Sequence, residues 1–376
     1  MATSGRSSKK GAAVAKEALD ALNAEAPVTA WAAYKKGRKK LSLRGVDLSG
    51  RTLHGVDFSD TILARADLRG ADLSGANLRG ADLRHANLSG AKLCGAKLCG
   101  AKLVKADFGE ADLSDADFSD VSGRPTNLVD PSTCEPTGAR FVKAKADRAR
   151  FINAELSGCN LSGLEAAGAI FDKAKLVRVA LNEAKLVEVR FGGASLNGAC
   201  MRDATVERCD LRGAEFTRVE AERARFTSCD FTKASLARSQ LRECALVECE
   251  CADADMLGVM FSKCVLRGSS FVRANLQKAY LSEDLRDVNF EGASLRGALV
   301  PNADLRNARL VKVDLRDADL SRSQLDGADL HCADLRNTGL QLTTLRGVTL
   351  KDATHGPRTQ WPSEVSQRAL TAMLSG

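Results

Sequence analysis

The sequence is poor in aromatic side chains, which make up only 5% of its 376 residues. Two tryptophans and two tyrosines are present, and the remaining rings are phenylalanines. Large globular cores take much of their buried area from such rings. The scarcity of rings therefore argues against a single large globular core and suits a protein with a thin interior.

Long apolar runs are also missing. No stretch approaches the ~18 consecutive apolar residues of a membrane span, and the N-terminal region lacks the apolar core of a signal peptide. The expectation is a cytoplasmic protein without a membrane partner.

The residue patterns of known enzymes are missing too. The four histidines, His54, His85, His331 and His355, are scattered along the chain. The many glycines follow a short repeat instead of opening a phosphate-binding helix. We therefore expect no enzyme: no catalytic residues, no cofactor and no metal site.

What the sequence does contain is an apolar residue at every fifth position. From Leu43 through Leu48, Leu53 and Phe58 to Phe118, each of these centre positions is Leu or Phe. On an α-helix a step of five turns about 140°, so the apolar side chains would not form a stripe. In a straight strand an odd step would send successive side chains to opposite faces. A short extended stretch followed by a bend in every repeat remains, and it predicts a coiled solenoid.

The residue two places before each centre is usually alanine, as in Ala71-Asp72-Leu73-Ser74-Gly75. We call this residue the corner residue, because its small size suits a crowded inner corner of the coil. Tandem repeats of this kind resemble the pentapeptide repeat family. The resemblance implies an all-β fold, a right-handed quadrilateral β-helix with four repeats in each coil. Apolar spacing at residues 8–25 and from Val365 to Leu374 adds short helical caps at both ends, with Ser363 as the N-cap of the second.

Two shifts of the five-residue register divide the chain. Two prolines lie in an eight-residue segment that shifts the repeat by three, and one residue is lost between Leu281 and Leu285. The resulting segments are a basic arm and helical cap (1–40), a first β-helix block (41–130), a Pro-rich loop (131–138), a second block (139–281), a third block (282–350) and a C-terminal cap helix (351–376).

Three groups of residues are candidate contact sites. The first is the basic arm, with Lys35, Lys36, Arg38, Lys39 and Lys40; the second is the loop, with Pro131, Cys134, Glu135 and Pro136; the third is a set of outward apolar residues, Met260, Tyr280, Val265 and Leu257. Each group also has an interpretation without function. The basic arm could be a solvated polar segment that leads into the first coil, the loop could be a tolerated insertion, and the apolar residues could be scattered surface residues of no consequence.

Six of the twelve cysteines replace alanine at corner positions, so we expect them to be reduced thiols in the core. With four repeats to a coil, Cys209, Cys229 and Cys249 would form one column, and Cys244 and Cys264 another. Whether these stacked cysteines are ever oxidised stays open. Cys94 and Cys99 are predicted to face solvent. Phe151, Phe171, Phe191, Phe231 and Phe271 are predicted to share a column on one side of the coil.

Two functions remain. The first is a non-catalytic structural or protein-interaction rod, with another protein or a second copy of the chain as partner. The alternative, implied by the resemblance, is a DNA mimic that binds and protects a type II topoisomerase. A mimic needs an acidic face, whereas the net charge here is +7 and the central block has more Lys and Arg than Asp and Glu. Nucleic acid is expected as a partner only through the basic arm.

Overall fold

The computed structural model describes residues 16–38, 41–123 and 137–375. The chain forms two compact units, Met1–Leu181 and Asn182–Gly376, each of which is a parallel β-solenoid. In both units a residue pairs with the residue 20 positions later, as in Asp67↔Asn87 and Asp210↔Asp230. Four five-residue repeats therefore close one coil, as the resemblance implied.

The physical reason for the coil is visible in a single repeat. Leu68 and its corner residue Ala66 are both buried, so two inward side chains in every five line the interior. The N–H of Leu68 donates to the carbonyl of Asn87 in the next coil at 2.7 Å. Gly70, two residues after the centre, has a φ of 63°, which turns the chain toward the next side. This combination repeats along the walls of both units and excludes water from a narrow apolar interior.

The first unit begins with helical residues 16–22, followed by α2 (Pro27–Lys35) and then the first coil. The sequence predicted one helix over residues 8–25, of which 8–15 lie outside the described residues. The second helix was missed, although Pro27 in its first turn is a common start signal. Farther along the unit lies the short strand β1 (Glu165–Ala167).

The described wall of the first block reaches Gly123 and resumes at Thr137. Across this point, ladder partners such as Asp107 and Arg140 are bridged although they are 33 residues apart instead of 20. Thirteen residues are thus added to one coil without separating the coils on either side. Thr137 and Gly138 belong to the wall, because both backbone N–H groups donate to the carbonyl of Gly158.

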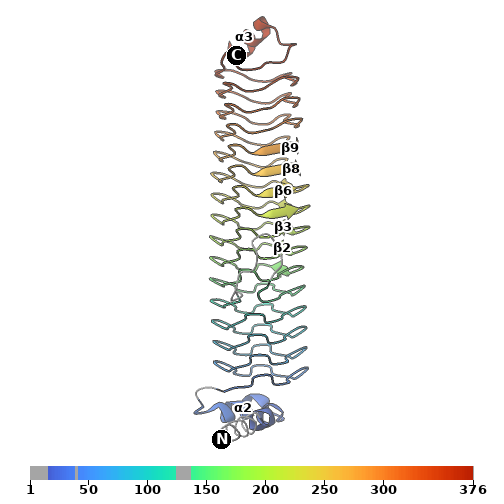
Figure 1. Cartoon of the computed structure of the whole chain (residues 1–376), viewed down its shortest axis with the longest axis vertical. Helices are drawn as coiled ribbons and strands as arrows, with labels where there is room; N and C mark the ends of the chain where they lie inside the picture. Colours follow the sequence, from blue (N-terminus) through green and yellow to red (C-terminus); the bar gives the residue numbers. More distant parts are fainter. Residues whose placement is uncertain (1–15, 39–40, 124–136, 376) are drawn as a thin grey trace, which may run out of the picture. The chain divides into compact units, whose positions relative to one another are not determined.

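The second unit carries the longer regular strands (Figure 1). One wall pairs β2 (Lys185–Val187), β3 (Thr205–Glu207), β5 (Arg225–Thr227) and β7 (Ala245–Val247) in parallel. The adjacent wall pairs β4 (Glu220–Glu222) with β6 (Gln240–Arg242). The six-residue strand β8 (Met260–Val265) joins the two walls, because it pairs with both β6 and β7.

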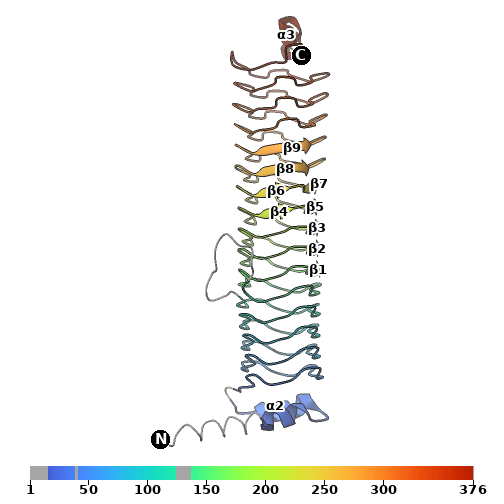
Figure 2. The same ribbon diagram turned by 45° about the vertical axis from the view of Figure 1, so that its right-hand side comes forward.

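Strand β9 (Tyr280–Asp284) pairs with β8, next to which it lies in Figure 2. Met260 faces Tyr280, but Cys264 faces Glu283, so the offset falls from 20 to 19 residues within this one strand pair. The one-residue loss expected between Leu281 and Leu285 is therefore confirmed. Ser282 fills the irregular position and accepts a hydrogen bond from the Lys263 N–H at 2.9 Å.

The unit ends in α3 (Gln367–Ser375), whose Leu370 is buried. The prediction of a C-terminal helix is confirmed, but its N-cap was predicted wrongly. Ser366, not Ser363, accepts the N–H of Ala369 at 3.2 Å, because the helix begins at Gln367, too far along the chain for Ser363 to reach its first turn.

The phenylalanine column exists in each unit. Phe151 stacks on Phe171 with ring centroids 4.5 Å apart in the first unit. In the second, residues 190, 210, 230, 250 and 270 form one continuous ladder, which places Phe191, Phe231 and Phe271 on the same side of alternate coils. Phe271 also stacks on Phe290 at 5.3 Å. These rings fill one side of an interior that is elsewhere lined mainly by leucine.

Candidate interaction surface

An exposed column of apolar side chains crosses three coils of the second unit. Met260 pairs with Tyr280 at the start of β8 and β9, and Tyr280 pairs in turn with Leu299. Met260 is 47% exposed, Leu299 is 50% exposed, and Tyr280 is half-buried. We call these three residues the apolar ladder. It has polar ends, because Gln240 precedes Met260 and Asp319 follows Leu299 in the same column.

The other two predicted members of this patch flank the ladder. Val265, at the far end of β8, is 37% exposed and pairs with Ala245 and Asp284 on the adjacent wall. Leu257 is half-buried, three residues before Met260 on the preceding side of the coil. The structure therefore places Met260 and Tyr280 next to each other, with Val265 around one corner and Leu257 before the other.

Sequence reasoning missed Leu299. A strict spacing of 20 would have placed Val300 after Tyr280, yet Val300 is a buried centre residue. The one-residue loss in β9 moves Leu299 into the outward column instead. The missing residue between Leu281 and Leu285 could have revealed Leu299 from the sequence. Across this point, stacked residues are 19 positions apart instead of 20.

The basic arm meets the first coils through Lys35. Its ammonium group donates to the carbonyl of Ser59 at 2.9 Å and to the Ser59 hydroxyl at 2.7 Å, and it pairs with the Asp57 carboxylate at 3.0 Å. Burial alone would raise the pKa of Asp57, but hydrogen bonds from Ser59 and Lys35 hold that pKa below its usual value. The Lys35 ammonium group is thus bonded to residues of the protein's own first coils.

The remaining arm residues divide into two groups. Lys36 is exposed, and the guanidinium of Arg38 lies over the ring of Tyr34, 4.2 Å from its centroid. Lys39 and Lys40 lie outside the described residues, as do the loop candidates Pro131, Cys134, Glu135 and Pro136.

The outer walls carry Asp and Arg in a recurring arrangement. Asp304, just before the centre Leu305, accepts the backbone N–H of Arg306 and forms two further bonds with its guanidinium at 2.7 and 2.8 Å. These hydrogen bonds from Arg306 lower the pKa of the Asp304 carboxyl. The same arrangement joins Asp67 to Arg69, Asp82 to Arg84, Asp210 to Arg212, Asp284 to Arg286, Asp314 to Arg316 and Asp334 to Arg336. These seven wall carboxylates are therefore paired locally with arginine.

Corner cysteines are buried, as predicted, and their thiols are free. Burial raises the pKa of Cys159 to about 12, which keeps this thiol protonated. Cys94 and Cys99 were predicted to face solvent but are only half-buried, since the neighbouring coil covers part of each; burial also raises their pKa. Cys332 is the exposed thiol among the described residues.

Within the described ranges, no helix has the length and apolar character needed to span a bilayer.

Parts of this chain are similar to solved structures of other proteins. The chain is similar over 57% of its length to QnrB1, a plasmid-mediated fluoroquinolone resistance protein, with 17% identity, 92% of that chain covered and a TM-score of 0.37. It is similar over 86% of its length to HetL of the cyanobacterium Nostoc sp. strain PCC 7120, a protein involved in regulating heterocyst differentiation, with 24% identity, 92% of that chain covered and a TM-score of 0.16. At such identities these likenesses concern the fold alone. No curated protein sequence matches the chain.

The family described as pentapeptide repeats matches in eight copies, which span residues 42–80, 81–120, 137–176, 174–213, 209–246, 249–283, 284–322 and 314–352. These copies cover most of the chain and coincide with the coils described above. The chain belongs to the pentapeptide repeat family.

Proposed function

We propose that this chain is a non-catalytic interaction solenoid that binds another protein through the apolar ladder. The observation that carries the proposal is the stacking of Met260, Tyr280 and Leu299 on one outer face. The coil itself is stabilised by the buried centre and corner residues, so exposed Met260 and Leu299 contribute little to folding. Apolar side chains gathered on an exposed wall are typical of contact sites between proteins.

The dimensions of the ladder indicate the kind of contact. Three coils at ~4.8 Å spacing place its outer side chains about 10 Å apart. An area of this size suits a small cluster of anchor residues surrounded by polar contacts. The polar ends, Gln240 and Asp319, would supply such a rim. The expected partner offers a few aromatic or aliphatic side chains to this wall.

The DNA-mimic alternative draws little support from the walls. Duplex imitation needs a run of uncompensated negative charge. Some described ladders alternate acids with bases, as in Asp72↔Lys92 followed by Lys92↔Asp112, and runs of stacked acids such as Asp210, Asp230 and Glu250 are short. Many wall carboxylates are also neutralised by the arginine two residues later. These features favour contact through apolar groups over imitation of phosphates.

The proposal is tested by placing charge on the ladder. The free energy of unfolding of the variant Met260→Asp/Tyr280→Asp/Leu299→Asp should lie within roughly 1 to 2 kcal/mol of the wild-type value, because the changes are at the surface. It should lose the proteins that co-purify with the tagged wild-type chain, or its self-association in sedimentation if the partner is a second copy. Leu342→Asp is the matched control, since Leu342 is 66% exposed and lies outside the ladder. Equal partner recovery and equal sedimentation for both variants and the wild type would contradict the proposal.

A further inference from the structure

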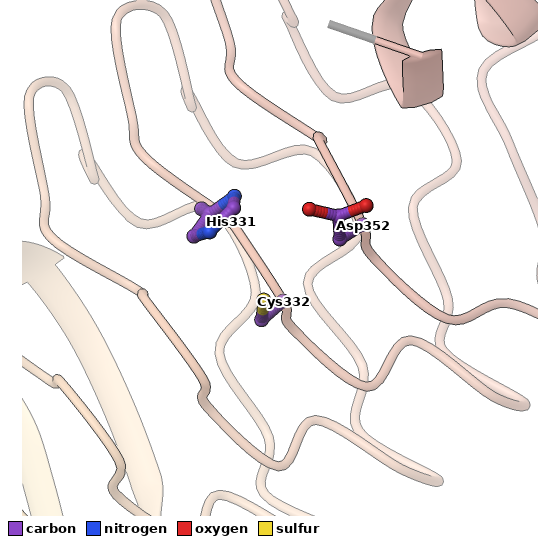
Figure 3. A group of neighbouring side chains, drawn as sticks. All are labelled: His331, Cys332 and Asp352. Carbon is purple, nitrogen blue, oxygen red and sulfur yellow. The ribbon is translucent and has the colours of Figure 1, made fainter.

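Three potential metal ligands converge near the end of the second unit. His331 and Cys332 follow the centre Leu330, and Asp352 follows the centre Leu350 of the next coil. One ring nitrogen of His331, the Cys332 sulfur and a carboxylate oxygen of Asp352 all lie within 4.8 Å of one another. Figure 3 shows the three side chains near one another, contributed by neighbouring coils. Because Cys332 and Asp352 are 20 residues apart, the coil spacing itself brings them together.

The backbone holds these side chains in fixed relative positions. Cys332 and Asp352 have φ angles of 58° and 57°, so they leave equivalent turns of adjacent coils in the same direction. The Cys332 N–H donates to the carbonyl of Lys351 at 2.9 Å, which ties the two coils together at this point. The His331 N–H donates to the Asp329 carboxylate at 3.1 Å. Ligands on such a rigid frame need little reorganisation to bind a metal.

We propose that His331, Cys332 and Asp352 form a zinc-binding site that is independent of the apolar ladder. Nitrogen, sulfur and oxygen ligands together suit Zn²⁺, whereas Mg²⁺ and Ca²⁺ prefer oxygen alone. A thiolate and a carboxylate balance the charge of the ion, and a neutral imidazole completes the set. Zinc bonds of about 2.0 to 2.3 Å place tetrahedral ligands roughly 3.3 to 3.8 Å apart, so the side chains close by about 1 Å on binding. The fourth position is open to water or to a ligand from a partner.

The surrounding charges set the strength of this site. Lys351 directly precedes Asp352, and Lys312 occupies the turn one coil before Cys332, with an equivalent φ of 56°. Both lysines are exposed. Their positive charges repel a dication, so Lys351→Ala should tighten zinc binding.

The site also adjoins the C-terminal cap. The backbone N–H of Asp352 donates to the carbonyl of Leu374 in α3 at 3.4 Å. A metal that fixes Asp352 against Cys332 would therefore hold together the last coils and the attachment point of α3. Zinc should slow amide hydrogen exchange of residues 350–354, because local opening there would require release of the ion.

The test is a zinc titration of chelator-treated full-length protein against a competing chromophoric chelator. The wild type should bind one zinc ion, and Cys332→Ser and Asp352→Asn should each bind at least about tenfold more weakly, since loss of even an outer-shell partner costs roughly 10- to 100-fold. Cys94→Ser, which removes another surface-side thiol, is the matched control and should bind as the wild type does. Cobalt in place of zinc should give a thiolate-to-metal absorption band that disappears in Cys332→Ser.

Cys332 and Asp352 are exposed and Cys94 is half-buried, so each metal-free variant should have nearly the same free energy of unfolding as the wild type. Absence of zinc binding by the wild type would overturn the proposal. So would unchanged affinity in Cys332→Ser, or a cobalt band that survives this substitution. Zinc binding without slower exchange at residues 350–354 would overturn the assignment of Asp352 as the third ligand.

Discussion

Corner residues determine how polar atoms are satisfied inside the coil. Where the corner is Ser, Thr or Cys, its side chain often donates to a backbone carbonyl 23 residues earlier, as in Cys244, Ser269 and Thr338. Cys229 donates to Val206 at 3.3 Å, and Ser239 donates to Phe216 at 2.5 Å. The two residue types therefore serve the same role, which explains why a column of buried thiols needs neither a metal nor a disulfide.

This equivalence predicts that Cys229→Ser preserves stability, because a hydroxyl can donate to the same carbonyl that the thiol uses. Cys229→Ala should instead cost about 0.5 to 1.5 kcal/mol, since the Val206 carbonyl loses that donor. Chemical denaturation of the two variants and the wild type measures the difference. A Ser variant less stable than the Ala variant would show that the interior rejects a hydroxyl at this corner.

Gly138 is a residue with no room for a side chain. A Cβ added there would lie 2.8 Å from the Cys159 sulfur and 3.0 Å from the carbonyl oxygens of Gly123 and Gly158. Since two of these atoms are backbone, Gly138→Ala should destabilise the first unit by roughly 1 to 3 kcal/mol. Gly356→Ala is the control, because a Cβ there would meet only Arg336 Cγ at 3.7 Å. Thermal unfolding of both variants checks this, and equal midpoints would contradict it.

At the scale of elements, the N-terminal cap closes the open end of the first coils. Trp31 in α2 is fully buried, and its indole N–H donates to the Asp57 carbonyl at 2.6 Å. Its ring lies against Phe58, with centroids 5.3 Å apart. Together with Lys35 on Ser59, this side chain fastens α2 to the solenoid and covers an apolar end that would otherwise face water.

Trp31→Ala should therefore loosen the first coils more than the rest of the unit. The loss of a buried tryptophan costs about 3 to 5 kcal/mol where the cavity stays open. In a solenoid each coil contacts only its neighbours, so the effect should be local. Hydrogen exchange should speed up for residues 41–60 and stay unchanged for residues 86–103. Uniform acceleration across both segments would mean that the unit unfolds as a single cooperative block.

Both end helices were predictable from the sequence, but their limits were not. The apolar spacing indicated helices near each end, whereas the separate helix α2 and the Ser366 cap depend on where the chain leaves the coil. Local spacing does not contain that information. The extended strand β8 was also missed, because its continuity across two walls comes from pairing with β6 and β7 at once.

At the scale of the whole molecule, the five-residue period was sufficient to predict the solenoid, and the resemblance supplied the four sides. The arrangement of surface residues was harder to predict, since it depends on register. A single lost residue in β9 brings Leu299 into line with Tyr280, and a 20-residue offset brings Asp352 next to Cys332. The two residues of each pair are far apart in sequence. The apolar ladder was therefore predicted only in part, and the grouping of His331, Cys332 and Asp352 was not predicted.

The paired wall carboxylates predict how stability depends on pH. Hydrogen bonds from Arg306, Arg316 and Arg336 lower the pKa of Asp304, Asp314 and Asp334 respectively from the usual value of 3.8. A carboxyl with a lower pKa in the folded state binds protons less readily there than in the unfolded chain. Its contribution to stability is therefore complete above the unfolded pKa and is lost as the pH falls through the folded one.

The triple variant Asp304→Asn/Asp314→Asn/Asp334→Asn isolates this contribution, because asparagine can still accept the backbone N–H but carries no charge. The wild type should be slightly more stable than the variant at about pH 7, by a small amount because the arginines are well exposed to solvent. The difference should shrink below about pH 4 and vanish near pH 2, as the three carboxyls become protonated. Denaturant midpoints across this range measure it. A gap that stays constant down to about pH 2 would show that the substitutions act through packing, with no contribution from the paired charges.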